Sequence, residues 1–190
     1  MAFWPPDPWP SGHLTPGYPV IGQEAGFVHG AYVDHDEWAV ADRPRVAHAV
    51  RLVDRAADRP HSPGPHRGSD RTVTVTRLHG LRDPSGKGDT PARRAQAERL
   101  AAPVQRTREP HDLVVVCGDL NLLPDSETFA VLAGFGLTDL VGTADTRTSR
   151  YLKPGRHANH LLVSDVAQVT SFEAPAAPEV SDHRPLELDV

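Results

Sequence analysis

Five consecutive apolar residues, Leu113–Cys117, lead directly into Gly118-Asp119-Leu120-Asn121, and this run constrains the fold more than any other feature of the sequence. Polar and charged residues bound it on both sides. A short, fully apolar segment of this kind predicts a central strand that is buried on both faces. The chain has 190 residues, which is enough for one domain with its own core. The run therefore predicts a single domain built around a covered sheet.

Segments with strand and helix patterns lie on both sides of this run. Residues 46–53 fit either a strand or a helix, since their valines favour the first and their alanines the second. A helix is expected over residues 91–108, because Thr90 offers a hydroxyl cap directly before a proline, and a short helix over 126–134. The other expected strands are 27–33, 72–78, 161–164, 166–172 and 186–190. This alternation predicts an α/β fold, an α/β sandwich of two packed β-sheets flanked by helices.

The N-terminal segment differs in composition from the rest of the chain. Residues 1–20 contain six prolines and show no hydrophobic period, so they are expected to form an irregular arm ahead of a domain over 21–190. No apolar stretch is long enough to span a membrane, and the N-terminus lacks the pattern of a secretory signal. A single cysteine excludes an internal disulfide and favours a reducing, cytoplasmic location.

Charge is unevenly distributed along the sequence. Residues 1–42 contain six acidic and no basic residues, whereas residues 43–110 hold 15 of the 20 basic residues and seven acidic ones. Residues 111–190 hold five basic and 12 acidic residues. A basic block beside an acidic one suits a site that holds a metal ion with carboxylates and a phosphate with arginines. On charge alone, an ordinary mixed surface is the simpler explanation.

The most informative polar residues follow the apolar run. Asp119 and Asn121 are two positions apart, so an extended chain points both side chains the same way. A carboxylate beside an amide can position a water molecule and also donate a hydrogen bond to an anionic oxygen. An Asx turn at the end of a strand explains the same two residues equally well.

Three histidine motifs supply further candidates. His79 follows the strand expected at 72–78 and opens a polar loop with Arg82 and Lys87, and Asn159 precedes the strand expected at 161–164. Asp182 and His183 are adjacent near the end of the sequence, where they suit a metal ligand with a general acid or base, or simply a surface turn.

Taken together and in this order, the motifs resemble those of the endonuclease/exonuclease/phosphatase superfamily of metal-dependent phosphoesterases. The resemblance runs from about Arg71 to Val190. Its segments are the strand that leads to a histidine (TVTVTRLHG), an Arg-x-x-Gln spacing at Arg93 and Gln96, and the blocks VVVCGDLNLLPDS, HANHLLVSD and VSDHRPLELDV. The ordered set, which closes on SDHRP, is more specific than any one motif.

The resemblance implies a role for each candidate residue. By analogy, Asp119 positions or deprotonates the attacking water, and Asn121 holds the scissile phosphate. His79 resembles the histidine that contacts the phosphate, and Asp182 a residue beside the divalent metal. His183 resembles the histidine that touches the phosphate and transfers a proton. Mg²⁺, with Mn²⁺ as an alternative, suits such a set of hard oxygen ligands.

Two departures from the family pattern bear on activity. The first 20 residues contain no asparagine and no strand pattern, so the family's opening motif is not found there. Glu24, after Gln23, resembles the family's metal-binding glutamate, although a loop glutamate fits its context equally well. Asn159 stands where the family has an aspartate, and an amide orients a neighbouring histidine without supplying charge.

The sequence therefore predicts a metal-dependent hydrolase of phosphodiesters or phosphomonoesters. The substrate is expected to be a nucleic acid or a phosphorylated small molecule or lipid. The alternative is a weakly active or non-catalytic remnant of the same fold, truncated or degenerate, that acts as a binding protein.

Overall fold

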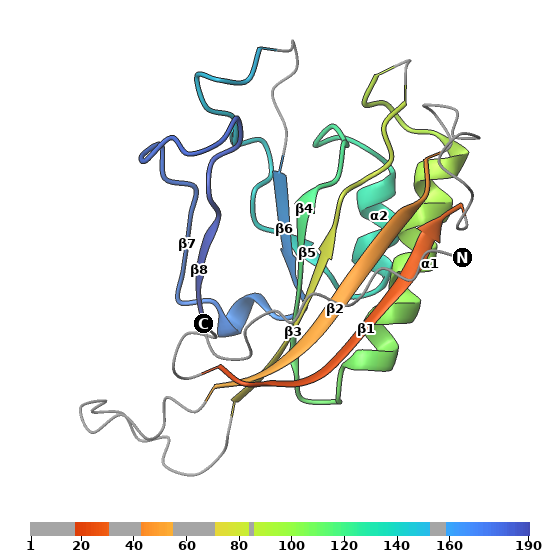
Figure 1. Ribbon diagram of the computed structural model, residues 1–190, viewed down its shortest axis with the longest axis vertical. Helices are drawn as coiled ribbons and strands as arrows, with labels where there is room; N and C mark the ends of the chain where they lie inside the picture. Colours follow the sequence, from red (N-terminus) through yellow and green to blue (C-terminus); the bar gives the residue numbers. More distant parts are fainter. Residues whose placement is uncertain (1–17, 31–42, 55–70, 84–85, 153–158) are drawn as a thin grey trace, which may run out of the picture.

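The computed structural model describes residues 18–30, 43–54, 71–83, 86–152 and 159–190. They form a six-stranded sheet in the order β1-β2-β3-β4-β6-β5 and a two-stranded sheet of β7 and β8 (Figure 1). The strands are β1 (Val20–His29), β2 (Arg45–Asp54), β3 (Arg71–Leu78), β4 (Leu113–Asp119), β5 (Thr138–Asp139), β6 (Asn159–Val163), β7 (Ser171–Glu173) and β8 (Glu187–Asp189). The helices are α1 (Pro91–Thr107), α2 (Thr128–Gly134) and the short 3-10 helix η3 (Val166–Gln168).

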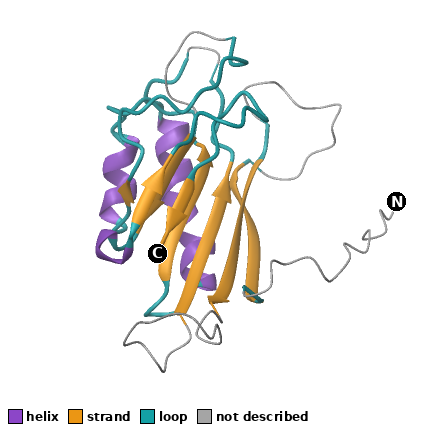
Figure 2. Cartoon of the chain, turned by 90° about the vertical axis from the view of Figure 1, so that its left-hand side faces the viewer, coloured by secondary structure: helices purple, strands orange, loops and turns teal. Residues whose placement is uncertain are grey.

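The predicted α/β sandwich is confirmed. Helices α1 and α2 cover one face of the large sheet, and β7 and β8 lie on the opposite side (Figures 1 and 2). Strand β4 lies inside the sheet, parallel to β3 and antiparallel to β6. Its Val114 and Val116 belong to the core on the helix side, whereas Leu113 and Val115 belong to the core shared with β7 and β8. Two cores, one on each face, explain why residues 113–116 of β4 are all apolar.

Several expected elements need adjustment. Residues 46–53 form a strand, which decides between the two readings of that segment. Strand β1 begins at Val20 and ends at His29, so Glu24 lies in a strand and not in a loop; residues 31–33 lie outside the described part. The strand expected over 166–172 is wrong for its first half, which is η3, because the Asp165 carboxylate accepts a hydrogen bond from the Ala167 N–H.

The rest of the sequence prediction concerns the arm and the membrane. Most of the arm expected over residues 1–20 lies outside the described residues. No helix in the described part of the chain is both long enough and apolar enough to cross a lipid bilayer.

The two helices begin at different kinds of cap. At α1, the Thr90 hydroxyl accepts a hydrogen bond of 3.2 Å from the Arg93 N–H, as the sequence predicts. At α2, the expected cap Ser126 accepts a hydrogen bond of 3.2 Å from the Thr128 N–H. The Asp89 carboxylate, 39 residues before Thr128, also accepts hydrogen bonds from the backbone N–H groups of Glu127 and Thr128 and from two hydroxyls. These bonds lower the pKa of Asp89 below its ordinary value.

Removing this carboxylate is expected to destabilise the start of α2. Asp89→Ala should lower the free energy of unfolding by about 1–2 kcal/mol, because the first N–H groups of the helix lose an acceptor. Urea unfolding followed by circular dichroism measures the loss. Asp125→Ala removes an exposed carboxylate close in sequence to the same helix and serves as the control. Equal losses in the two variants would show that Asp89 does not cap α2.

Candidate active site

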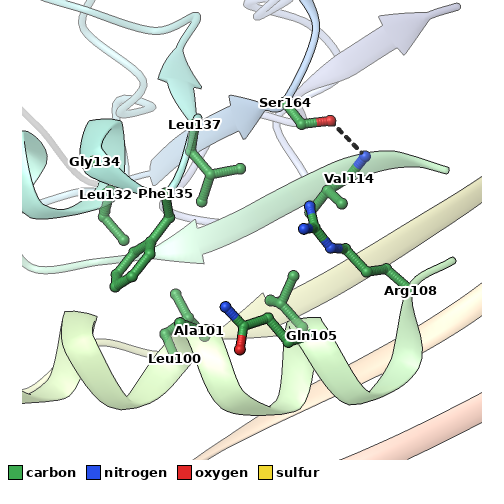
Figure 3. Close-up of a pocket in the computed structure, with 11 residues that line it drawn as sticks. Leu100, Ala101, Gln105, Arg108, Val114, Leu132, Gly134, Phe135, Leu137 and Ser164 are labelled. Carbon is green, nitrogen blue, oxygen red and sulfur yellow. Dashed lines mark hydrogen bonds between the residues drawn. The ribbon is translucent and has the colours of Figure 1, made fainter. Parts of the chain in front are cut away.

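Two concave regions of the molecule differ in their chemistry. A groove of about 260 Å³ lies between α1 and α2, with Leu100, Leu132 and Leu137 on its walls and Arg108 at its edge (Figure 3). Its lining contains no histidine and no carboxylate, so it lacks groups for acid–base chemistry. A second cavity, of about 310 Å³, is lined by residues that follow β3 and β4 and by residues near the C-terminus. The polar cavity is therefore the candidate site.

The parallel pairing of β3 and β4 positions the first residues of this cavity. Both strands end at the same edge of the sheet, and there the Gly80 N–H donates a 2.6 Å hydrogen bond to the Asp119 carbonyl. Gly118 has a φ of 141°, and a Cβ placed on it would lie 1.9 Å from the Leu78 carbonyl oxygen. Only glycine fits this close approach. The two strand ends therefore hold His79 and Asp119 next to each other on the cavity wall.

Five of the seven predicted site residues line this one cavity. They come from three segments separated by up to about a hundred residues: His79, Asp119, Asn121, Asp182 and His183. These five residues therefore line one cavity although they lie far apart in the sequence.

Asn121 forms an Asx turn with Asp119 and also lines the cavity, so the two interpretations of this motif are compatible. Its φ is 53°, and its backbone N–H donates a 3.0 Å hydrogen bond to Oδ1 of Asp119, which makes an Asx turn. Its side-chain Nδ2 donates a 3.1 Å hydrogen bond to the Gly80 carbonyl. The turn itself therefore fixes the carboxylate and the amide, and it joins the loop after β4 to the loop after β3.

The two histidines of the cavity lie in different surroundings. Burial lowers the pKa of His79, and Arg45, Arg82 and His183 lower it further, although Asp119 opposes them. His79 is therefore mainly neutral at pH 7, since the ordinary pKa of histidine is about 6.5. The His183 ring packs edge-on against Tyr151 with centroids 5.5 Å apart. Its Nδ1 is buried and has no hydrogen-bond partner among the described residues, and its Nε2 lies 3.7 Å from Oδ2 of Asp182.

Asn159 lies behind the cavity and not on its lining. Its side-chain Nδ2 donates a 3.4 Å hydrogen bond to the Arg184 carbonyl, and its backbone N–H donates a 3.0 Å bond to the Thr146 hydroxyl. The Arg184 N–H in turn donates to the Thr146 carbonyl at 2.8 Å. The amide thus holds the backbone beside His183, and the predicted contact with the imidazole itself is not among the bonds of the described residues.

The structure does not bring Glu24 to the cavity. Its carboxylate forms an ion pair with Arg106 of α1. The side chain leaves β1 on the helix side of the sheet, the side on which Val28 packs into the helix-side core. The strand register of β1, which the sequence does not reveal, decides this direction.

A buried arginine organises the loop that follows β3. Arg93 is 2% exposed and donates hydrogen bonds to three backbone carbonyls: Leu81 through Nε at 3.3 Å, Gly86 through Nη2 at 2.6 Å, and Gly88 through Nη1. Gln96 accepts a 3.0 Å hydrogen bond from the Leu81 N–H. The Arg-x-x-Gln spacing is therefore a device that fixes the loop on the cavity wall.

Two residues near the cavity are not predicted from the sequence. Tyr151 lines the cavity from an irregular segment, where a lone aromatic residue carries no periodic signal. Arg45 opens β2, and burial chiefly lowers its pKa, with help from Arg43 and Arg82, while Asp119 raises it. Its Nε is buried without a partner among the described residues. Because the sequence of residues 46–53 fits a helix as well as a strand, it does not predict that Arg45 lies near His79.

Comparison with known proteins identifies the family. The sequence model of the endonuclease/exonuclease/phosphatase family matches residues 5–183 of this chain. The chain belongs to this family. No curated protein matches it in a sequence search.

Solved structures of the endonuclease/exonuclease/phosphatase family share the fold. The mannosyl-6-phosphatase Bt3783 of Bacteroides thetaiotaomicron is 14% identical, with a TM-score of 0.61 over 93% of this chain and 68% of that one. The human Nocturnin catalytic domain with bound sulfate is 18% identical, with a TM-score of 0.55 over 93% and 62%. D. rerio TDP2 with a single-strand DNA product is 12% identical, with a TM-score of 0.52 over 90% and 68%. The chain spans about two thirds of the length of these neighbours.

Membership of this family raises the question of a divalent metal. The described residues contain no group of three or more His, Cys, Asp or Glu side chains arranged to hold one. The cavity does offer the carboxylates of Asp119 and Asp182 and the amide of Asn121. Mg²⁺ is commonly held by one or two carboxylates together with waters and substrate phosphate. By donor type, these three residues therefore fit Mg²⁺.

Proposed function

We propose that the chain is a Mg²⁺-dependent phosphoesterase whose active site is the cavity at the ends of β3 and β4. One observation carries the proposal. His79, Asp119, Asn121, Asp182 and His183 reach the same 310 Å³ cavity from three separate segments. A cavity with convergent carboxylates, histidines and an amide, all in a family of hydrolases, supports hydrolysis of a phosphate ester.

Each residue has a role that follows from its position. Asp119, fixed by the turn to Asn121, accepts a proton from the attacking water as the new P–O bond forms. The neutral His79 and the Asn121 amide donate hydrogen bonds to the phosphate oxygens. His183 gives a proton to the ester oxygen as the old P–O bond breaks. Asp182 would hold Mg²⁺, which supplies positive charge against the phosphate oxygens.

The neighbours support two substrate classes. A mannosyl-6-phosphatase acts on a phosphorylated sugar, and TDP2 is seen with a single-strand DNA product. The substrate proposed for this chain is accordingly a phosphorylated small molecule or a nucleic acid. A non-catalytic binding protein of the same fold is the second candidate, because Glu24 is paired with Arg106 and lies away from the cavity.

Turnover of generic esters tests the proposal. We expect p-nitrophenyl phosphate or bis-p-nitrophenyl phosphate to be hydrolysed with Mg²⁺ or Mn²⁺ and not with EDTA. Asp119→Asn should lower kcat/KM by roughly 10²–10⁴-fold, the usual effect of losing a general base. Asp125→Asn, which changes an exposed carboxylate four residues after Asn121, should leave kcat/KM unchanged. An absence of metal-dependent turnover, or equal rates for Asp119→Asn and the unchanged protein, would favour the binding protein.

A further inference from the structure

Two cationic side chains that follow β3, Arg82 and Lys87, line the cavity together with Arg93. Arg93 donates hydrogen bonds to the carbonyls of Leu81, Gly86 and Gly88, so the described backbone next to each cation is held before any substrate arrives. Asp83 lines the same cavity, and its carbonyl accepts a hydrogen bond from the Gly86 N–H. The cavity therefore presents two preorganised cations beside one carboxylate of the same loop.

Tyr151 relates these cations to the proposed catalytic groups. The Lys87 ammonium lies 3.5 Å from the Tyr151 hydroxyl and 5.7 Å from the ring centroid. On the same ring, the His183 imidazole packs at 5.5 Å. One aromatic ring thus separates Lys87 from the histidine proposed to act on the scissile phosphate. That phosphate has its own partners in His79 and Asn121 and does not need Arg82 or Lys87.

We infer that Arg82 and Lys87 form a second anion subsite, and that the substrate is a small molecule carrying a second phosphate beside the scissile one. This inference rests on the proposed function for the position of the scissile phosphate. The ammonium and guanidinium donate charge-assisted hydrogen bonds to the second phosphate.

Size and charge favour a small molecule over a nucleic acid. The cavity volume of about 310 Å³ lies at the lower end of the range for small-molecule sites, roughly 300–1,000 Å³. The whole chain has a net charge of −5, which opposes the sequence-independent attraction of an extended polyanion. Arg82 and Lys87 supply two local cations for a small anion, although Asp83 lines the same cavity.

Binding of inorganic anions in EDTA separates this subsite from catalysis. Isothermal titration should show that pyrophosphate binds at least about tenfold more tightly than orthophosphate, since it carries a second phosphate for Arg82 and Lys87. The double variant Arg82→Gln/Lys87→Gln should lose that preference and keep its orthophosphate affinity within about twofold. Arg94→Gln/Arg99→Gln removes the same charge from exposed positions of α1 and should keep the preference. Unchanged circular dichroism checks that each variant is folded.

Three results would overturn the inference. They are equal affinities for the two anions, a preference that survives in Arg82→Gln/Lys87→Gln, and a single-stranded oligonucleotide that displaces pyrophosphate at lower concentration and depends on the same two residues. A pyrophosphate preference that depends on Arg82 and Lys87, without metal-dependent ester turnover, would keep the subsite and overturn only the proposed function. Metal-dependent ester turnover without a pyrophosphate preference would keep the proposed function and overturn only the subsite.

Discussion

Gly118→Ala is expected to lower the free energy of unfolding by at least about 3 kcal/mol, and to leave little folded protein at 37 °C. The added Cβ would lie 1.9 Å from the Leu78 carbonyl oxygen, and the φ of 141° disfavours any L side chain. Relief would require β3 and β4 to separate. These strands are paired over five residues and packed on both faces, so they cannot do so cheaply.

Gly136→Ala provides a matched control for Gly118→Ala. Gly136 also has a positive φ, of 79°, but a Cβ there would meet nothing within 4 Å. Its substitution should lower the free energy of unfolding only through backbone strain, by about 1–2 kcal/mol. Urea unfolding of both variants measures the difference. If both variants lost the same free energy of unfolding, contact with the Leu78 carbonyl would not be what restricts position 118 to glycine.

Asp112→Asn is expected to cost about 3–5 kcal/mol, because it removes the charge from a buried ion pair. The side chain of Asp112 is fully buried. Its carboxylate accepts hydrogen bonds from Arg51 at 2.8 and 3.1 Å, from the Thr74 hydroxyl at 2.7 Å, from the Thr72 hydroxyl and from the Glu109 N–H at 3.0 Å. Asparagine keeps one acceptor oxygen and introduces an N–H₂ group among donors. Asp125→Asn, at an exposed position, is the control.

The same carboxylate predicts how stability depends on pH. Burial alone would raise the pKa of Asp112, but the hydrogen bonds from Arg51, Thr72, Glu109 and Thr74 hold it far below its ordinary value. A lowered folded-state pKa stabilises the protein above the unfolded-state value of about 3.9, and this stabilisation is lost as pH falls toward the folded-state pKa. Stability of the unchanged protein should therefore fall below about pH 4–5. In Asp112→Asn this fall should be shallower, and an unaltered pH profile would contradict the assignment.

The sequence predicts the elements whose local pattern agrees with their surroundings. The apolar run Leu113–Cys117 identifies β4, since both faces of that strand are covered. Strand β5 has only two residues and forms by pairing with β6, so no local sequence pattern predicts it. Val166 and Ala167 are apolar, as expected in a strand, but the Asp165 carboxylate accepts a hydrogen bond from the Ala167 N–H and residues 166–168 form a 3-10 turn.

The same distinction separates the predicted and the unpredicted parts of the site. Asp119 and His79 were predictable as candidates because Asp119 ends one strand and His79 directly follows another, and the two strands are parallel and end at one edge. Glu24 was not, because a strand presents its residues alternately to two sides and only the pairing with β2 decides which side Glu24 takes. Tyr151 contacts Lys87 across 64 positions, a separation over which sequence spacing carries no information.

Arg93 holds its loop through backbone carbonyls at residues 81, 86 and 88. Every amino acid supplies such a carbonyl, so these three hydrogen bonds do not depend on the side chain at position 82. Asp83 differs: burial lowers the pKa of the Arg93 guanidinium, and the negative charge of Asp83 opposes this shift. A library randomised at position 82 alone should therefore yield mostly folded proteins, and it offers a direct route to variants with altered ligand preference.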